Sequence, residues 1–445
     1  MDTPSFLSAQ LVVSVIMNLI VVHVILLTVA YLIYVERKVC AYIQDRIGPN
    51  RVGFDFGLPF LSFLKGKLGL GQPLADGLKF MLKEDYAPRN VDKVLFTLAP
   101  AIIIIPALIG FVVIPWGGVW QCPDIHIPFS DYVIPGGPVR VTGANVNAGV
   151  IYLLAVASLG AYGVTLGGWA SNNKYSFLGG LRATAQMISY EIPLGLALLA
   201  VLVIVGSVVP DEIVRYQATN GWMIVAQPIA AMVFFIAILA EANRAPFDNA
   251  EAEQELVGGY HTEYSSMRFA LFFLAEYAHL VTSTAFFTML FLGGYHLPFI
   301  KLLSPESTTF AAALLKFAVF FGKVVAIVSF TMVIRWTIPR LRYDQVMMMA
   351  WQAVIPIALL VVVVASVMVY FDLRGVVPML LANAGMLVLI LVVQPLMPRA
   401  LTNKRITLYG SRFSPMPGER VITGVRTAAA LEDRPVEGIA TARVI

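Results

Sequence analysis

The chain has 445 residues, of which 58% are hydrophobic and only 13% are charged, and its mean hydropathy is +0.79. Soluble domains carry about 25% charged residues, and a chain this apolar cannot hide its apolar surface in one water-soluble core. The formal net charge of +4 is small, and Lys and Arg lie in loops, not on one basic face, so nothing indicates nucleic-acid binding. The composition predicts an all-α, polytopic membrane protein.

Motifs for bound cofactors are missing from the sequence. The two cysteines, Cys40 and Cys122, form no C-x-x-C, and there is no G-x-G-x-x-G or Walker A sequence. The histidines at 23, 261 and 279 show no metal-ligand spacing. We therefore expect no metal, iron–sulfur cluster or nucleotide on this chain, and any redox chemistry to be carried out by partners.

Nine apolar stretches have the length of a membrane span, which is about 20 residues. They lie near 9–35, 93–115, 147–169, 184–207, 221–241, 267–293, 309–334, 348–371 and 376–396. The first stretch is too long for the apolar part of a signal peptide and has no positive charge before it, so we interpret it as a retained span.

Basic residues predict the orientation of these spans. The loops at 36–93, 170–182, 242–262 and 335–347 carry 16 Lys and Arg, whereas the four opposite loops carry only four. The positive-inside rule then places the first set of loops in the cytoplasm. The N-terminus is expected on the periplasmic side, and the tail, with eight further basic residues, in the cytoplasm.

The first of these loops contains a predicted surface helix. Apolar residues recur at 74, 78, 81 and 82 within residues 70–84, a helical stripe that suits a helix lying on the membrane surface. Charged residues of the same loop, namely Glu36-Arg37-Lys38, Arg46, Asp76 and Lys79, are typical of anchors at the membrane edge.

The loop after the fifth predicted span is strongly acidic. It begins at Glu241 and holds four acids within eight residues, Asp248, Glu251, Glu253 and Glu255. Packed carboxylates repel each other and can retain protons, as a proton relay requires. The alternative is a D-x-x-E capping box, in which Asp248 and Glu251 only start a helix over 249–257.

Other ionisable residues fall inside predicted spans. Glu191 lies in the fourth span and Glu276 in the sixth, and a carboxylate at this depth costs roughly 2.5–3.5 kcal/mol. Each is a candidate functional group or, alternatively, part of an ion pair that holds spans together, for which Arg182 is a possible partner. Lys316 and Lys323, on one face of the seventh span, are either relay groups or lysines buried against an acid.

At these motifs the sequence resembles the H subunit (also called subunit 1) of proton-translocating NADH:quinone oxidoreductase, respiratory complex I. The resemblance extends from about residue 30 to 371. It is carried by Glu36-Arg37-Lys38, Arg46–Gly53, Gln72–Lys79, Gly168–Asn172, Leu181–Glu191, Glu241–Asp248, Glu253–Glu263, Arg268–Tyr277 and Pro339–Gln345.

The resemblance implies an eight-helix tilted bundle over 1–371 that lines an entry tunnel for a lipid quinone. The extra span at 372–397 and the basic, flexible tail at 398–445 lie beyond it. The partners would be peripheral quinone-site and iron–sulfur subunits, which carry FMN and the clusters, and small membrane-arm subunits. Residues matching the family's acidic channel and acidic loop are Glu36, Glu191, Glu241, Glu276, Asp248, Glu251, Glu253 and Glu255; residues matching the tunnel are Arg37, Arg46, Asp76, Lys79, Arg244 and Phe247.

Three departures and two alternatives stay open. Asn249-Ala250 replaces the family's Leu-Pro, residues 54–71 look inserted, and Gln352 stands where a Lys is common. The alternatives are the membrane anchor subunit of a related membrane-bound hydrogenase or formate hydrogenlyase, and a stand-alone ion-coupled carrier. The extended Arg46–Gly53 and Gln72–Lys79 motifs favour the quinone enzyme, and the lack of an inverted repeat argues against the carrier.

Overall fold

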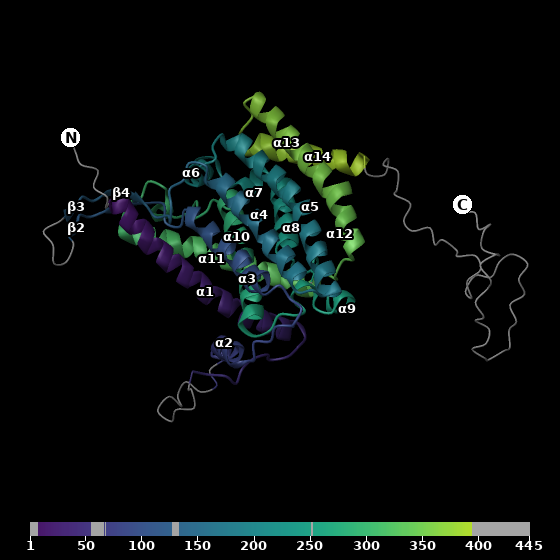
Figure 1. The fold of residues 1–445 in the computed structure, drawn as a ribbon. Coiled ribbons are helices and arrows are strands. Elements are labelled where there is room, and N and C mark those ends of the chain that lie inside the picture. The colour runs from purple at the N-terminus through teal and green to yellow at the C-terminus, as the bar shows by residue number, and fades with distance from the viewer. Residues whose placement is uncertain (1–7, 55–65, 67, 127–132, 251, 394–445) are drawn as a thin grey trace, which may run out of the picture. The chain divides into compact units, whose positions relative to one another are not determined.

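The computed structural model describes residues 8–54, 66, 68–126, 133–250 and 252–393 (Figure 1). Two compact units, 1–386 and 387–445, divide the chain, and the helix bundle belongs to the first. The α-helices are α1 (Ala9–Ile43), α2 (Gln72–Leu82), α3 (Lys93–Ile109), α4 (Gly149–Ala170), α5 (Lys174–Val205), α6 (Pro210–Asn220), α7 (Met223–Ala226), α8 (Pro228–Glu241), α9 (Glu253–Leu256), α10 (Ser266–Phe291), α11 (Phe310–Thr337), α12 (Tyr343–Met349), α13 (Ile355–Tyr370) and α14 (Val376–Val393). Short 3-10 turns are η2 (Gly110–Val113), η3 (Gly259–His261) and η4 (Lys301–Leu303), and a π-helical segment, Ala350–Val354, joins α12 to α13.

The predicted all-α membrane architecture is confirmed. Within the described residues, eight helical stretches are long and apolar enough to cross a membrane. They are α1, α3 with η2, α4, α5, α10, α11, the continuous stretch from α12 to α13, and α14. The predicted basic tail at 398–445 and the end of the predicted last span, 394–396, lie outside the described residues.

The predicted fifth span, 221–241, is wrong as one continuous helix. It is divided into α7 and α8 at Gln227, whose backbone angles (φ −131°, ψ 62°) are not helical. α8 has 14 residues and is therefore about 21 Å long, short of a hydrocarbon core of roughly 30 Å. A ninth spanning helix is accordingly not confirmed.

The core is formed by α3, α4, α5, α8 and α10, and α4 lies between α3 and α5 (Figure 1). Glycines let these helices approach closely. A Cβ on Gly163 would lie 2.8 Å from the backbone nitrogen of Ile103 in α3, and one on Gly168 would lie 2.6 Å from the carbonyl of Ser176 in α5. Such small residues are what membrane helices use where backbones meet.

Two short hairpins were not predicted. In the segment between α3 and α4, β1 (Val119–Cys122) pairs antiparallel with β4 (Gly137–Arg140), and β2 (Ile125–His126) pairs with β3 (Val133–Ile134). These strands have two to four residues, too few for the alternating pattern by which strands are recognised.

The predicted surface helix is present as α2. Its apolar residues are bare in the isolated chain, with exposed fractions from 43% at Leu74 to 86% at Leu82. The segments on either side of the apparent insertion meet closely: the amide of Gly71 donates to the carbonyl of Val52 at 3.1 Å, and a Cβ on Gly71 would lie 2.1 Å from the carbonyl of Gly53. Residues 54–70 therefore leave and re-enter at one point, and most of them lie outside the described residues.

Lys323 on α11 closes the end of α10. Its ammonium group donates to the carbonyls of Leu292 (2.7 Å), Gly294 (2.9 Å) and His296 (2.8 Å), which follow the last turn of α10. A cation at a helix C-terminus is stabilised both by these acceptors and by the helix dipole. This geometry supports a structural role for Lys323.

Lys323→Met is accordingly expected to destabilise the fold, because three carbonyls lose their donor. Unsatisfied buried groups cost about 1–3 kcal/mol each, so the thermal midpoint of the purified protein should fall by several degrees. Thermal unfolding in detergent measures this. Exposed Lys93→Met at the start of α3 is the control, and an unchanged midpoint for Lys323→Met would contradict the role assigned to it.

Candidate functional site

Glu36 on α1 is the centre of a buried polar cluster. Its side chain accepts hydrogen bonds from the Tyr277 hydroxyl of α10 and from the Arg335 guanidinium of α11. Arg244, which follows α8, places Nη1 3.7 Å from Glu36 Oε2. Glu36 is only 8% exposed, so its charge is balanced by arginines, not by water.

Arg244 connects Glu36 to a second acid. Its Nε lies 2.8 Å from Glu276 Oε1, and the two side chains are each 7% exposed. The guanidinium also stacks over the Tyr277 ring at 4.0 Å, a favourable cation–π distance. We call Glu36, Arg244, Glu276, Tyr277 and Arg335 the Glu36 cluster; it joins α1, α10, α11 and the turn after α8.

A glutamine of α5 holds that turn in place. Gln186 donates to the carbonyl of Ala240 at 2.9 Å and to the carbonyl of Phe247 at 2.8 Å, one acceptor on each side of Arg244. The Phe247 ring is buried against Tyr190 of α5, with centroids 5.4 Å apart. Arg244 therefore sits on a turn that is fixed at both ends.

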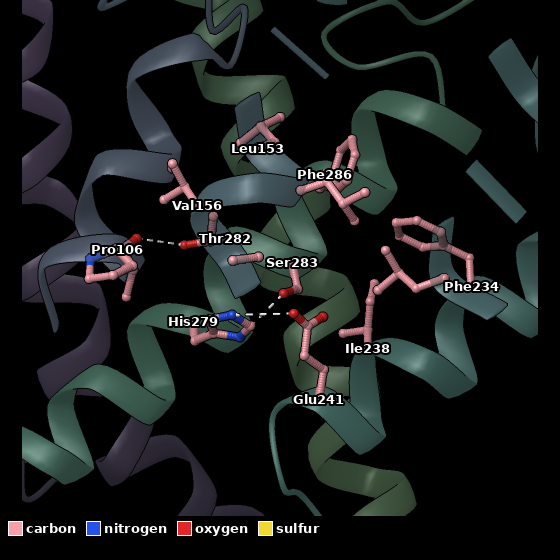
Figure 2. Close-up of a pocket in the computed structure, with 15 residues that line it drawn as sticks. Pro106, Leu153, Val156, Phe234, Ile238, Glu241, His279, Thr282, Ser283 and Phe286 are labelled. Atoms are coloured by element: carbon pink, nitrogen blue, oxygen red, sulfur yellow. Dashed lines mark hydrogen bonds and ion pairs between the residues drawn. The ribbon is translucent and has the colours of Figure 1, made fainter. Parts of the chain in front are cut away.

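Glu241, the last residue of α8, faces a small internal cavity (Figure 2). Its Oε1 lies 3.6 Å from His279 Nε2, and His279 Nδ1 lies 3.5 Å from the Ser283 hydroxyl. The cavity measures about 20 Å³, enough for a single water molecule. Most of its lining is apolar, including Ile238 and Phe286 as Figure 2 shows.

Glu191 on α5 lies close enough to Glu241 to interact with it electrostatically. Its carboxylate accepts a hydrogen bond from the Ser158 hydroxyl of α4. The sequence offered His279 only as a poor metal ligand and gave no signal for Ser158. Neither role depends on a motif, because α4, α5, α8 and α10 meet only in the folded chain.

The acidic loop does not form the expected capped helix. The predicted capping box of Asp248 and Glu251 is wrong, because α9 spans only Glu253–Leu256 and its N-cap residue is Ala252, with no side-chain cap. Asp248 instead lies 3.6 Å from Arg340, and Glu255 pairs with Arg182 at 2.5 Å. The interpretation of Arg182 as a partner for the span acids is also wrong in this respect. Glu251 lies outside the described residues, as does the side chain of Glu253.

The substituted position beside this loop is buried. Asn249 is 1% exposed, and its side-chain amide makes no hydrogen bond to the described residues. The carbonyl of Pro246, on the same turn, accepts from the amide of Leu341 at 3.1 Å. The turn is thus tied to the segment between α11 and α12 by backbone as well as by the Asp248–Arg340 pair.

A cleft of about 440 Å³ opens beside the Glu36 cluster. Its lining residues come from α1, the loop after it, α10 and α11: Ile33, Glu36, Arg37, Cys40, Ala41, Arg46, Gly48, Phe273, Tyr277 and Trp336. Arg37 at its edge pairs with Asp76 of α2 at 2.8 Å, and exposed Lys79 lies 4.0 Å from the same carboxylate.

The predicted tunnel residues therefore fall into two groups. Arg37 and Arg46 line the cleft, and Asp76 and Lys79 border it through Arg37. Arg244 and Phe247 are not among its lining residues; Arg244 reaches it through Glu36 and Tyr277, and Phe247 packs on α5. Among the described residues, no group of three or more potential metal ligands comes together.

Comparison with known proteins places this geometry in a family. The family model described as NADH dehydrogenase matches residues 16–366. Curated relatives include an H subunit (the first of its kind) of the NADH-quinone oxidoreductase of Geobacter sulfurreducens, 45% identical over 360 residues, which are 80% of this chain and 95% of the relative. The corresponding subunit of Protochlamydia amoebophila is 46% identical over 346 residues (77% and 93%), and that of Cytophaga hutchinsonii is 43% identical over 336 residues (76% and 90%). The chain belongs to the NADH dehydrogenase family, as a relative of the H subunit of NADH-quinone oxidoreductase.

Proposed function

We propose that this chain is a multi-pass subunit of a proton-translocating NADH:quinone oxidoreductase, lines the quinone entry tunnel, and couples quinone reduction to proton movement through its buried acids. The observation that carries the proposal is the double position of Glu36 and Tyr277. Both line the cleft, and both contact Arg244, which pairs with Glu276 in the interior. A change of charge in the cleft would therefore act directly on the buried ion pairs.

The cleft suits a lipid quinone. Ile33, Phe273 and Trp336 provide an apolar wall, and Arg46, Arg37 and Glu36 provide a few polar groups, the usual composition of a small-molecule site. The bare apolar residues of α2 next to the cleft would sit in the membrane surface, where a lipid-soluble substrate enters. No redox centre is needed on this chain if FMN and iron–sulfur clusters are carried by partner subunits.

From the cluster, ionisable groups continue inward along two turns. Glu276 and His279 are three residues apart on α10 and thus neighbours on one face, and Glu241 and Arg244 are three apart at the end of α8. The order Glu36, Arg244, Glu276, His279, Glu241 alternates between these elements and the cleft, and Glu191 extends it to α5. We infer that the acids transmit the charge change along this order toward the pumping subunits.

Orientation and partners complete the proposal. The distribution of Lys and Arg places the cleft, α2 and the acidic loop on the cytoplasmic side of a bacterial inner membrane, with the N-terminus periplasmic and the basic tail cytoplasmic. Peripheral quinone-site and iron–sulfur subunits would cover the cleft, and small membrane-arm subunits would receive the proton signal.

A hydrogenase or formate hydrogenlyase anchor is the competing function, since such a protein would share buried acids but needs no quinone cleft. We expect the tagged chain, solubilised in mild detergent, to co-purify with flavin- and NADH-binding subunits in a complex that reduces quinone with NADH. Membranes without the tag control for nonspecific recovery. Recovery with a nickel hydrogenase and no NADH-oxidising activity would overturn the proposal.

A further inference from the structure

The helix break at Gln227 is buried and polar. The Gln227 side chain is 1% exposed, and the Ala226 carbonyl belongs to the last turn of α7, whose carbonyls lack partners within their own helix. In a membrane interior an unpaired carbonyl costs several kcal/mol, so such a break requires a donor from elsewhere in the protein.

α14 supplies this donor. Asn383, which is 1% exposed, donates from Nδ2 to the Ala226 carbonyl and to Gln227 Oε1, both at 3.1 Å. Gln227 in turn places Nε2 3.4 Å from the sulfur of Met379, which is also buried. Met379, Asn383 and Met386 share one face of α14 and are the buried residues of that helix, whereas Leu381 on another face is 67% exposed. α14 thus docks on the break by one polar residue set between two methionines.

The docking site is connected to the candidate relay. α8 starts directly after Gln227 and ends at Glu241, so one 14-residue rod carries the break at one end and the acid at the other. Its second end is held by the bond from Gln186 to the Ala240 carbonyl. Any shift of the rod along its axis would change the 3.6 Å separation of Glu241 and His279.

The matched family region ends at residue 366, before α14 begins at Val376. We propose that α14 is an added clamp for the break between α7 and α8, and that Asn383 is a positioning residue for Glu241. The clamp itself depends only on the contacts above, whereas the role assigned to Glu241 rests on the proposed function.

The test compares Asn383→Leu, which has similar size but no donor, with Leu381→Ala on the exposed face of the same helix. The variants are made in the full chain and purified in the assembled complex. Hydrogen–deuterium exchange over residues 223–231 reports the clamp, and the pH profile of quinone-dependent NADH oxidation reports the placement of Glu241. Asn383→Gln, which retains the amide donors, should restore both readouts toward wild type.

We expect faster exchange at 223–231, a displaced pH profile and a rate loss of roughly 3- to 10-fold in Asn383→Leu, and wild-type behaviour in Leu381→Ala. Unchanged exchange would overturn the clamp. Faster exchange with an unchanged pH profile would overturn the positioning of Glu241. Asn383→Ser, whose hydroxyl is too short to reach Ala226, replaces the leucine variant in the same measurements if that variant does not assemble. Because exchange does not depend on turnover, failure of the proposed function leaves the clamp separately decided.

Discussion

Glu241→Gln is expected to lower quinone-dependent NADH oxidation by roughly 100-fold while the complex still assembles. Gln has nearly the same size as Glu and can keep a hydrogen bond to His279, which lies 3.6 Å from the carboxylate. It cannot gain or release a proton, and proton transfer by a positioned side chain contributes roughly 10²–10⁴-fold to rates. The measurement is NADH oxidation with added quinone in native membranes.

Two controls separate this effect from general damage. NADH oxidation with a water-soluble acceptor, which takes electrons without the quinone cleft, should be unchanged. Glu212→Gln removes the same charge from the first turn of α6, where the carboxylate is exposed, and should have nearly wild-type activity. Full quinone-dependent activity in Glu241→Gln would show that this acid is not part of the coupling route.

The long helices could be predicted from the sequence because their signal is local. Twenty or more apolar residues in a row leave a membrane chain few choices, since every backbone group must be satisfied within the segment. That argument locates α1, α4, α5, α10 and α11 within a few residues. It fails at 221–241, where hydropathy is continuous but the backbone turns at Gln227, because the partner that stabilises the break is Asn383, more than 150 residues later.

The site could be predicted only in part, for a related reason. Acids in or beside spans stand out by their cost, so Glu36, Glu191, Glu241 and Glu276 could be named in advance. Their partners could not, because each pair joins distant segments: Glu36 to Arg335, and Glu241 to His279. The capping box failed because the D-x-x-E pattern is local, whereas Asp248 pairs with Arg340 on another segment.

The position of Arg244 explains why its loss should be the most damaging single charge change in this bundle. One guanidinium pairs with Glu276 at 2.8 Å, approaches Glu36 at 3.7 Å and stacks on Tyr277 at 4.0 Å. Removing one partner of a buried ion pair costs about 3–5 kcal/mol, because the charge that stays behind is neither paired nor solvated. Even Lys is a poor substitute, since a point charge cannot bond sideways and stack at once.

Arg244→Met should therefore give less assembled complex, a thermal midpoint lower by several degrees and a loss of quinone-dependent turnover of more than roughly tenfold. Adding Glu276→Gln to Arg244→Met should recover part of the stability, because the abandoned carboxylate is removed, but no turnover. The matched control is Arg342→Met, which breaks a pair with Asp344 whose arginine side chain is 71% exposed, and it should cost at most about 1 kcal/mol. Native gels, thermal unfolding in detergent and quinone-reductase assays on the same membranes measure these effects. If the double variant were no more stable than Arg244→Met alone, Glu276 would not depend on Arg244 for its stability, and the link between the cleft and the inner acids would be broken at that contact.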